Sequence, residues 1–62
     1  MKNGIYKNNH VTYFIYNNKI LMLLNGNMYK TNKNFMQGKY KEDLPENLIN
    51  DFNDVYDKVK FW

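Results

Sequence analysis

The sequence predicts an α+β fold, an antiparallel three- to five-stranded β-meander followed by one C-terminal amphipathic helix packed on one face. Residues 11–31 contain β-branched, aromatic and aliphatic runs that are separated by Asn-Asn and Asn-Gly pairs, the pattern of consecutive hairpins. From Leu48 onward the apolar residues change to helical spacing. We therefore expect a single small domain over residues 1–62, with the meander in 1–41 and the helix in 43–62.

Three strands are expected in the centre of the meander. The runs "HVTYFIY", "KILMLL" and "NMYKT" are rich in residues that favour strands. Asn17-Asn18 and Asn25-Gly26 separate them, and both pairs tolerate the positive φ angles of two-residue hairpin turns. A short strand around Ile5 and Tyr6 and an edge strand within residues 35–40 complete the predicted sheet.

The helix is predicted from a core-facing apolar stripe. Its members are Leu48, Ile49, Phe52, Val55, Tyr56, Val59 and Trp62. Asp43, three residues before Glu46, resembles a capping box, and Pro45 suits a first turn. Leu44 is the alternative cap, because a residue before proline resists helical geometry. Lys58 and Lys60 are expected in the last turn, where they favour the helix dipole.

Two-residue turns divide the side chains of the meander between two largely apolar faces. The first face carries Val11, Tyr13, Ile15, Ile20, Met22, Leu24 and Tyr29. The second face carries Thr12, Phe14, Tyr16, Lys19, Leu21, Leu23, Met28 and Lys30. The first face is nearly all apolar and matches the helix stripe, so we assign the helix to it.

The second face is then predicted to form an intermolecular interface, because contiguous apolar patches on small proteins usually mark contact surfaces. Its expected contact residues are Phe14, Tyr16, Leu21, Leu23 and Met28. A homodimer is the simplest partner, and a host or phage protein is another. In the alternative, residues 1–9 and 32–41 fold over this face and make a small closed barrel.

Charge is distributed unevenly along the chain. Residues 1–41 hold seven lysines and no acid, whereas residues 42–62 hold six acids and two lysines, so the net charge of +3 combines +7 and −4. Lysines interleaved with tyrosines are typical of single-strand-binding surfaces, and Lys19 and Lys30 are the possible nucleic-acid contacts. Because arginine is absent, a nucleic-acid-binding function, our alternative hypothesis, would be nonspecific in sequence.

No catalytic residue, cofactor site or metal site is predicted, and we do not expect an enzyme. Serine and cysteine, the commonest nucleophiles, are absent, and all acids lie more than thirty positions from His10. The segment 51–57 fails as a calcium loop, since Val55 and Tyr56 occupy the places of a ligand and of glycine.

Location and origin are predicted from composition. No apolar run approaches the ~18 residues that span a bilayer, so we expect a cytoplasmic protein without membrane contact. Twelve asparagines and nine lysines, without arginine, serine or alanine, indicate an AT-rich genome of the kind found in low-GC bacteria and their phages. The sequence thus suggests a non-enzymatic accessory protein of phage, prophage or mobile-element type, acting as a protein-interaction module.

Overall fold

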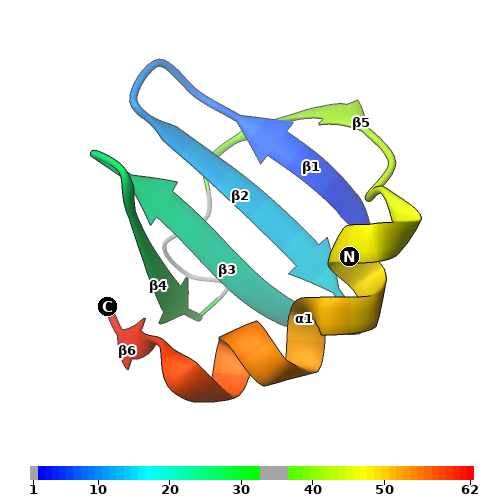
Figure 1. Ribbon diagram of the computed structural model, residues 1–62. Coiled ribbons are helices and arrows are strands. Elements are labelled where there is room, and N and C mark those ends of the chain that lie inside the picture. The colour runs from blue at the N-terminus through cyan, green and yellow to red at the C-terminus, as the bar shows by residue number, and fades with distance from the viewer. Residues whose placement is uncertain (1, 33–36) are drawn as a thin grey trace.

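The computed structural model describes residues 2–32 and 37–62, which form a six-stranded sheet crossed by one helix (Figure 1). In chain order the elements are β1 (Gly4–Lys7), β2 (Val11–Tyr16), β3 (Lys19–Leu24), β4 (Asn27–Thr31), β5 (Lys39–Glu42), α1 (Glu46–Lys58) and β6 (Lys60–Phe61). The spatial order is β5-β1-β2-β3-β4-β6, antiparallel except for the β4–β6 pair. The predicted α+β fold, a meander followed by one helix, is confirmed. Residues 35 and 36 of the expected edge strand lie outside the described residues.

Both predicted two-residue turns are present and fix the register of the central strands. Asn17 and Asn18 have φ angles of 48° and 65°, and Asn25 and Gly26 have φ angles of 51° and 79°. Two consecutive positive φ angles match the right-handed twist of the flanking strands. Tyr16 therefore pairs with Lys19 and Leu24 with Asn27, which confirms the predicted division of side chains between two faces.

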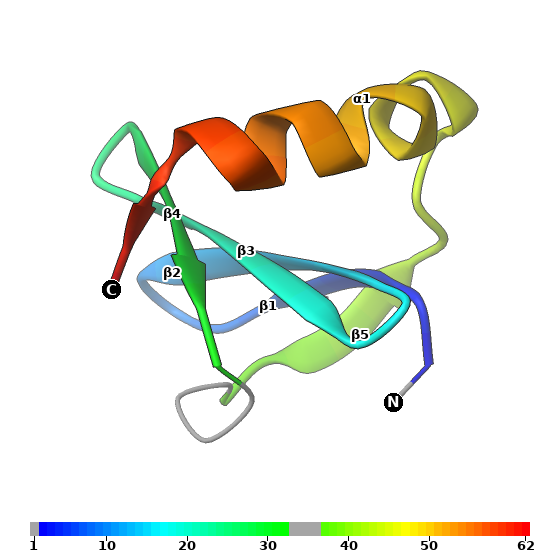
Figure 2. The same cartoon turned by 90° about the horizontal axis from the view of Figure 1, so that it is seen from below.

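The sheet curves around the first face. In Figure 2, β4 and β5 turn away from α1, so the sheet has a concave face and a convex face, and α1 lies on the convex one. The concave face holds a core whose members are at most 4% exposed, namely Tyr13, Ile15, Ile20 and Met22. Gly38, just before β5, closes this face, since a Cβ there would lie 3.1 Å from the Tyr13 ring. The sheet thus buries its concave side chains with its own strands.

The helix covers the second face, so our assignment of α1 to the first face is wrong. The Phe52 ring lies 5.4 Å from the Tyr16 ring, and both Phe52 and Leu21 are completely buried. Each face is apolar enough to accept the helix stripe, but the curled sheet already fills the concave face and leaves no room for a helix ~10 Å wide. The closed-barrel alternative, with residues 1–9 and 32–41 over the second face, is not what forms: β1 and β5 extend the sheet beside β2, and α1 covers part of the second face.

The helix begins without the predicted side-chain cap. Pro45 is the N-cap residue, and its carbonyl accepts hydrogen bonds of 3.1 Å from the backbone N–H groups of Leu48 and Ile49. The carboxylate of Asp43 accepts a hydrogen bond from the Tyr40 hydroxyl and makes no cap bond. The capping-box prediction is therefore wrong, because the Asp43 carboxylate is hydrogen-bonded to Tyr40 of the preceding strand β5 and not to the first turn of the helix.

The helix ends earlier than the apolar stripe suggested. Lys58 lies in the last turn, as expected, but Val59 is extended, with φ −89° and ψ 159°. Lys60 and Trp62 therefore lie beyond the helix, and their helical assignment is wrong. The backbone N–H of Trp62 donates a 2.7 Å hydrogen bond to the Lys30 carbonyl. By leaving the helix, the chain thus supplies a hydrogen-bond donor to the edge of β4.

The placement of the helix predicts different responses at two leucines of the convex face. Leu21 is fully buried and Leu23 is half-buried. We expect Leu21→Lys to lower the free energy of unfolding by at least about 3 kcal/mol, because it forces a charge under the helix. Leu23→Lys, the matched control, should cost about 1 kcal/mol or less. Urea denaturation followed by circular dichroism measures both, and equal losses would contradict this placement of α1.

A buried hydroxyl provides a second test of the core. Thr31 is 2% exposed, and its Oγ1 has no hydrogen-bond partner among the described residues. Thr31→Val keeps the shape of the side chain and removes the unsatisfied group, so the free energy of unfolding should rise by about 1 kcal/mol. Thr31→Ala also leaves a cavity and should be less stable than Thr31→Val. A loss of stability in the valine variant would mean that the hydroxyl is satisfied in solution.

Candidate functional site

The five residues predicted as an interface lie on the face that α1 crosses, not on an open one. Leu21 is completely buried, and Tyr16 packs against Phe52. Phe14, Leu23 and Met28 are half-buried, and Figure 1 shows the helix crossing only one end of the sheet, near the end of β2 and the start of β3. Self-association through these residues stays a prediction, with a smaller apolar surface than the sequence suggested.

Lys19 and Lys30, the predicted nucleic-acid contacts, both point to the helix. The Lys19 Nζ donates a 2.9 Å hydrogen bond to the Asn53 Oδ1. The Nζ atoms of Lys19 and Lys30 lie 5.5 Å and 5.2 Å from the centroid of the Tyr56 ring, within the range of cation–π attraction. These two ammonium groups therefore help to hold α1 on the sheet.

Another group of lysines gathers where β1 meets β5. Lys7 and Lys39 are direct cross-strand partners. The register shifts between Ile5, which pairs with Glu42, and Tyr6, which pairs with Tyr40, so Lys41 is the extra residue of a bulge. We call Lys7, Lys39 and Lys41 the basic edge. Like charges placed opposite each other destabilise a sheet, so this arrangement calls for an explanation beyond the fold.

The electrostatics of the basic edge show the crowding of positive charge. The neighbouring Lys41 lowers the pKa of the exposed Lys7, first through a side-chain hydrogen bond and then through charge repulsion. Desolvation adds to this lowering, and the negative charge of Glu42 opposes it. An anion bound at this edge would relieve the repulsion between the ammonium groups.

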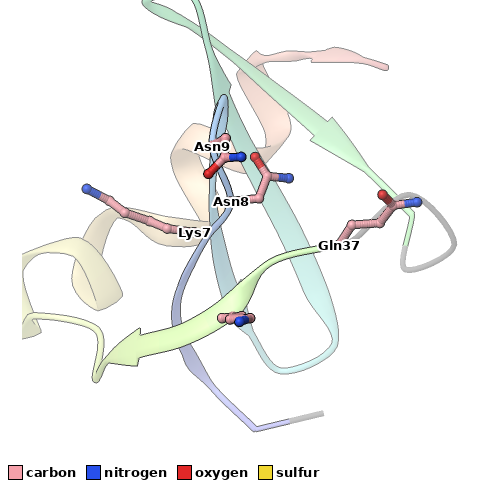
Figure 3. Close-up of a pocket in the computed structure, with 5 residues that line it drawn as sticks. Lys7, Asn8, Asn9 and Gln37 are labelled. Carbon is pink, nitrogen blue, oxygen red and sulfur yellow. The ribbon is translucent and has the colours of Figure 1, made fainter.

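A polar hollow of about 470 Å³ adjoins the basic edge (Figure 3). It is lined by Lys7, Asn8, Asn9, Gln37 and Lys39. In Figure 3, the side chains of Lys7 and Gln37 extend to opposite sides, with Asn8 and Asn9 between them. The lining residues offer ammonium and amide N–H donors, the groups that bind phosphate oxygens.

The loop between β1 and β2 holds part of this lining in place. The Asn8 Oδ1 accepts hydrogen bonds of 2.9 Å and 2.8 Å from the backbone N–H groups of His10 and Val11. The carbonyl end of the Asn8 amide is therefore used by the turn, which leaves its NH₂ end as a donor. His10 is exposed in this loop.

An exposed tyrosine lies on the other side of β5. Tyr40 is 41% exposed, and the Lys2 Nζ lies 4.2 Å from the centroid of its ring. The Tyr6 ring meets the Tyr40 ring edge-on at 5.4 Å and supports it from the neighbouring strand. Lysines and an accessible aromatic ring thus occur together at this edge of the sheet.

Residues 2–32 and 37–62 contain neither a metal-binding cluster nor a membrane-spanning helix. No group of three or more His, Cys, Asp or Glu side chains in this part of the chain could hold a metal ion. No helix there is long and apolar enough to cross a membrane.

Comparisons with known proteins supply no relative. No protein-family model, curated protein or solved structure matched the chain. Functional inference therefore depends on the geometry and charge of this molecule.

The basic edge was not among the sites predicted from the sequence. The excess of lysine in residues 1–41 was visible, but Lys7 and Lys39 are far apart in the chain and meet only through the β1–β5 pairing. The bulge that adds Lys41 has no signal in the sequence. The alternation of lysine and tyrosine in "KYK" is the signal in the sequence that could have indicated a basic, partly aromatic edge strand.

The Tyr40–Asp43 hydrogen bond predicts a pH dependence of stability at alkaline pH. This bond is the main reason that the pKa of Tyr40 rises from 10.0 to about 12. Because the folded state holds this proton more tightly, the stabilisation is complete below pH 10 and is lost as the pH rises from 10 to about 12. The free energy of unfolding should therefore fall more steeply over this range in the native protein than in Tyr40→Phe. Urea denaturation at several pH values measures this, and parallel curves would contradict the bond.

Proposed function

We propose that the protein is a non-enzymatic nucleic-acid-binding protein that contacts the phosphate backbone through the basic edge. The observation that carries this proposal is the convergence of three lysines on the β1–β5 ladder: Lys39 lies opposite Lys7, and Lys41 lies close enough to lower the pKa of Lys7. Among the acids, only Glu42 acts on Lys7 against this repulsion. A polyanion that neutralises several lysines and releases counterions is the ligand best suited to such a cluster.

An extended ligand fits the basic edge better than a small anion does. The donors follow an exposed sheet edge and the adjoining loop, and their flexible side chains diverge in Figure 3 without enclosing one point. Lysine ammonium groups and amides suit phosphate contacts, which position a nucleic acid but carry no sequence information. We therefore expect little preference for base sequence.

The homodimer predicted from the sequence is the second candidate. The observation that favours it is the half-buried strip of Phe14, Leu23 and Met28 on the convex face. Sedimentation over a hundredfold range of concentration distinguishes a mass of 7.6 kDa from twice that value. A phage, prophage or mobile-element origin remains a hypothesis based on composition.

Binding of a labelled single-stranded oligonucleotide tests the proposed function. We expect Lys7→Gln/Lys39→Gln to weaken binding at low salt about tenfold and to reduce the slope of log affinity against log salt by about 1 to 1.5. Lys19→Gln/Lys30→Gln is the matched control, since it removes the same charge from the lysines at α1. It should lower the affinity much less. Fluorescence anisotropy measures both affinities.

Three outcomes of this experiment would contradict the proposal. Equal weakening by the two double variants would mean that only net charge matters. A larger effect of the control pair would restore Lys19 and Lys30 as the contacts. Absence of binding by the native protein at low salt would remove the nucleic-acid function altogether.

A further inference from the structure

The opposite edge of the sheet carries exposed aromatic side chains beside lysines. β6 runs parallel to β4, with Lys60 opposite Tyr29 and Phe61 opposite Lys30. Trp62 directly follows β6, and its backbone N–H still donates to Lys30 of β4, so the strand alternation continues and Trp62 lies on the face of Lys60 and Tyr29. The Trp62 ring lies 5.6 Å from the Tyr29 ring, which confirms this placement.

The indole of Trp62 is held in place but remains accessible. The hydrogen bond from the backbone N–H of Trp62 to the Lys30 carbonyl anchors the end of the chain to β4, and the Tyr29 ring lies against the indole. The Trp62 side chain is nevertheless 53% exposed. A positioned, half-exposed aromatic ring can stack on a flat partner with little further loss of conformational entropy.

Positive charge and a hollow lie beside Tyr29, the residue that the Trp62 ring packs against. Lys60 lies opposite Tyr29, and the Trp62 ring packs against the same tyrosine. A hollow of about 400 Å³ is lined by Asn27, Met28, Tyr29, Lys58, Val59 and Lys60. Exposed Asp57 is the nearest acid in the sequence, and residues 57–62 still carry a net charge of +1. An aromatic platform beside lysines has the composition of a site for one nucleotide, with the ring against the base and the ammonium groups near its phosphate.

We infer that Trp62, with Tyr29 and Lys60, is a base-stacking site and that the ligand is therefore single-stranded. This inference rests on the proposed function and names its substrate class. In a duplex the base faces are already stacked, so an exposed ring at the edge of the protein gains a partner only from an unpaired base. Pairing with a second copy is less favoured, because β6 offers only two residues, Lys60 and Phe61, to a neighbouring strand.

Trp62 is the only tryptophan of the chain, so its intrinsic fluorescence reports directly on this site. The probes are an oligothymidylate single strand, a duplex of mixed sequence and inorganic polyphosphate, each added to the native protein. We expect the single strand to quench the fluorescence strongly as it binds. Polyphosphate should compete for the basic edge without quenching, because it has no bases to stack.

Variants then separate stacking from backbone contacts. Trp62→Ala should weaken anisotropy-detected binding of the single strand about tenfold and leave the affinity for polyphosphate unchanged. Trp62→Phe keeps an aromatic ring and should recover most of the affinity, which a purely structural role restricted to the indole would not explain. Phe61→Ala is the matched control, since Phe61 is 61% exposed but lies on the other face of β6.

The outcomes distinguish failure of this inference from failure of the proposed function. Binding of the single strand without quenching, or equal losses in Trp62→Ala and Phe61→Ala, would overturn the stacking site and leave the basic edge in place. Absence of any binding would overturn both. Quenching that follows protein concentration without nucleic acid, with a doubling of the sedimenting mass that Trp62→Ala abolishes, would assign the ring to a homodimer and overturn the inference.

Discussion

The rest of the structure depends on one constraint, which is that β3 carries apolar side chains on both faces. The run Ile20–Leu24 has no polar residue, so neither face of the central strand can remain in water. A chain of 62 residues meets this constraint in two ways. The sheet curls until its own strands bury Ile20 and Met22, and α1 supplies Phe52 on the opposite side, where Leu21 is buried. The curvature of the sheet and the position of the helix together bury the two faces of β3.

This solution determines where charged side chains can lie. Both faces of the central strands are largely used for packing. Lysine side chains therefore lie mainly near the edges of the sheet and beside the helix. Lys19 and Lys30 take the helix margin, where their ammonium groups meet the Tyr56 ring. All residues of β5 and β6, the two outer strands, are exposed. A row of paired residues joins the two edges along the concave face, in the order Tyr40, Tyr6, Tyr13, Met22 and Tyr29.

The sequence was sufficient for the local features and insufficient for the long-range ones. Asn-Asn and Asn-Gly turns and the helix stripe are local signals, so the turns, the register and the existence of α1 could be predicted. The choice of face could not, because both faces are apolar and the stripe fits either. That choice depends on curling, which requires contacts between β5 and the distant β1. The basic edge is hidden for the same reason, since pairing and a bulge bring its lysines together.

Edge lysines also have an ordinary structural role, because charge on an outer strand prevents edge-to-edge association of sheets. That role accounts for Lys39 and Lys41, which lie on β5, but not for Lys7, which lies on β1 between β5 and β2. Lys7 lies opposite Lys39 and is repelled by the charge of Lys41, and its position does nothing to protect the margin of the sheet. The β6 margin differs again, since it exposes Phe61 and Trp62 beside Lys60. One edge has more positive charge than protection requires, and the other exposes aromatic rings. The proposed binding of a polyanion with unpaired bases would account for both.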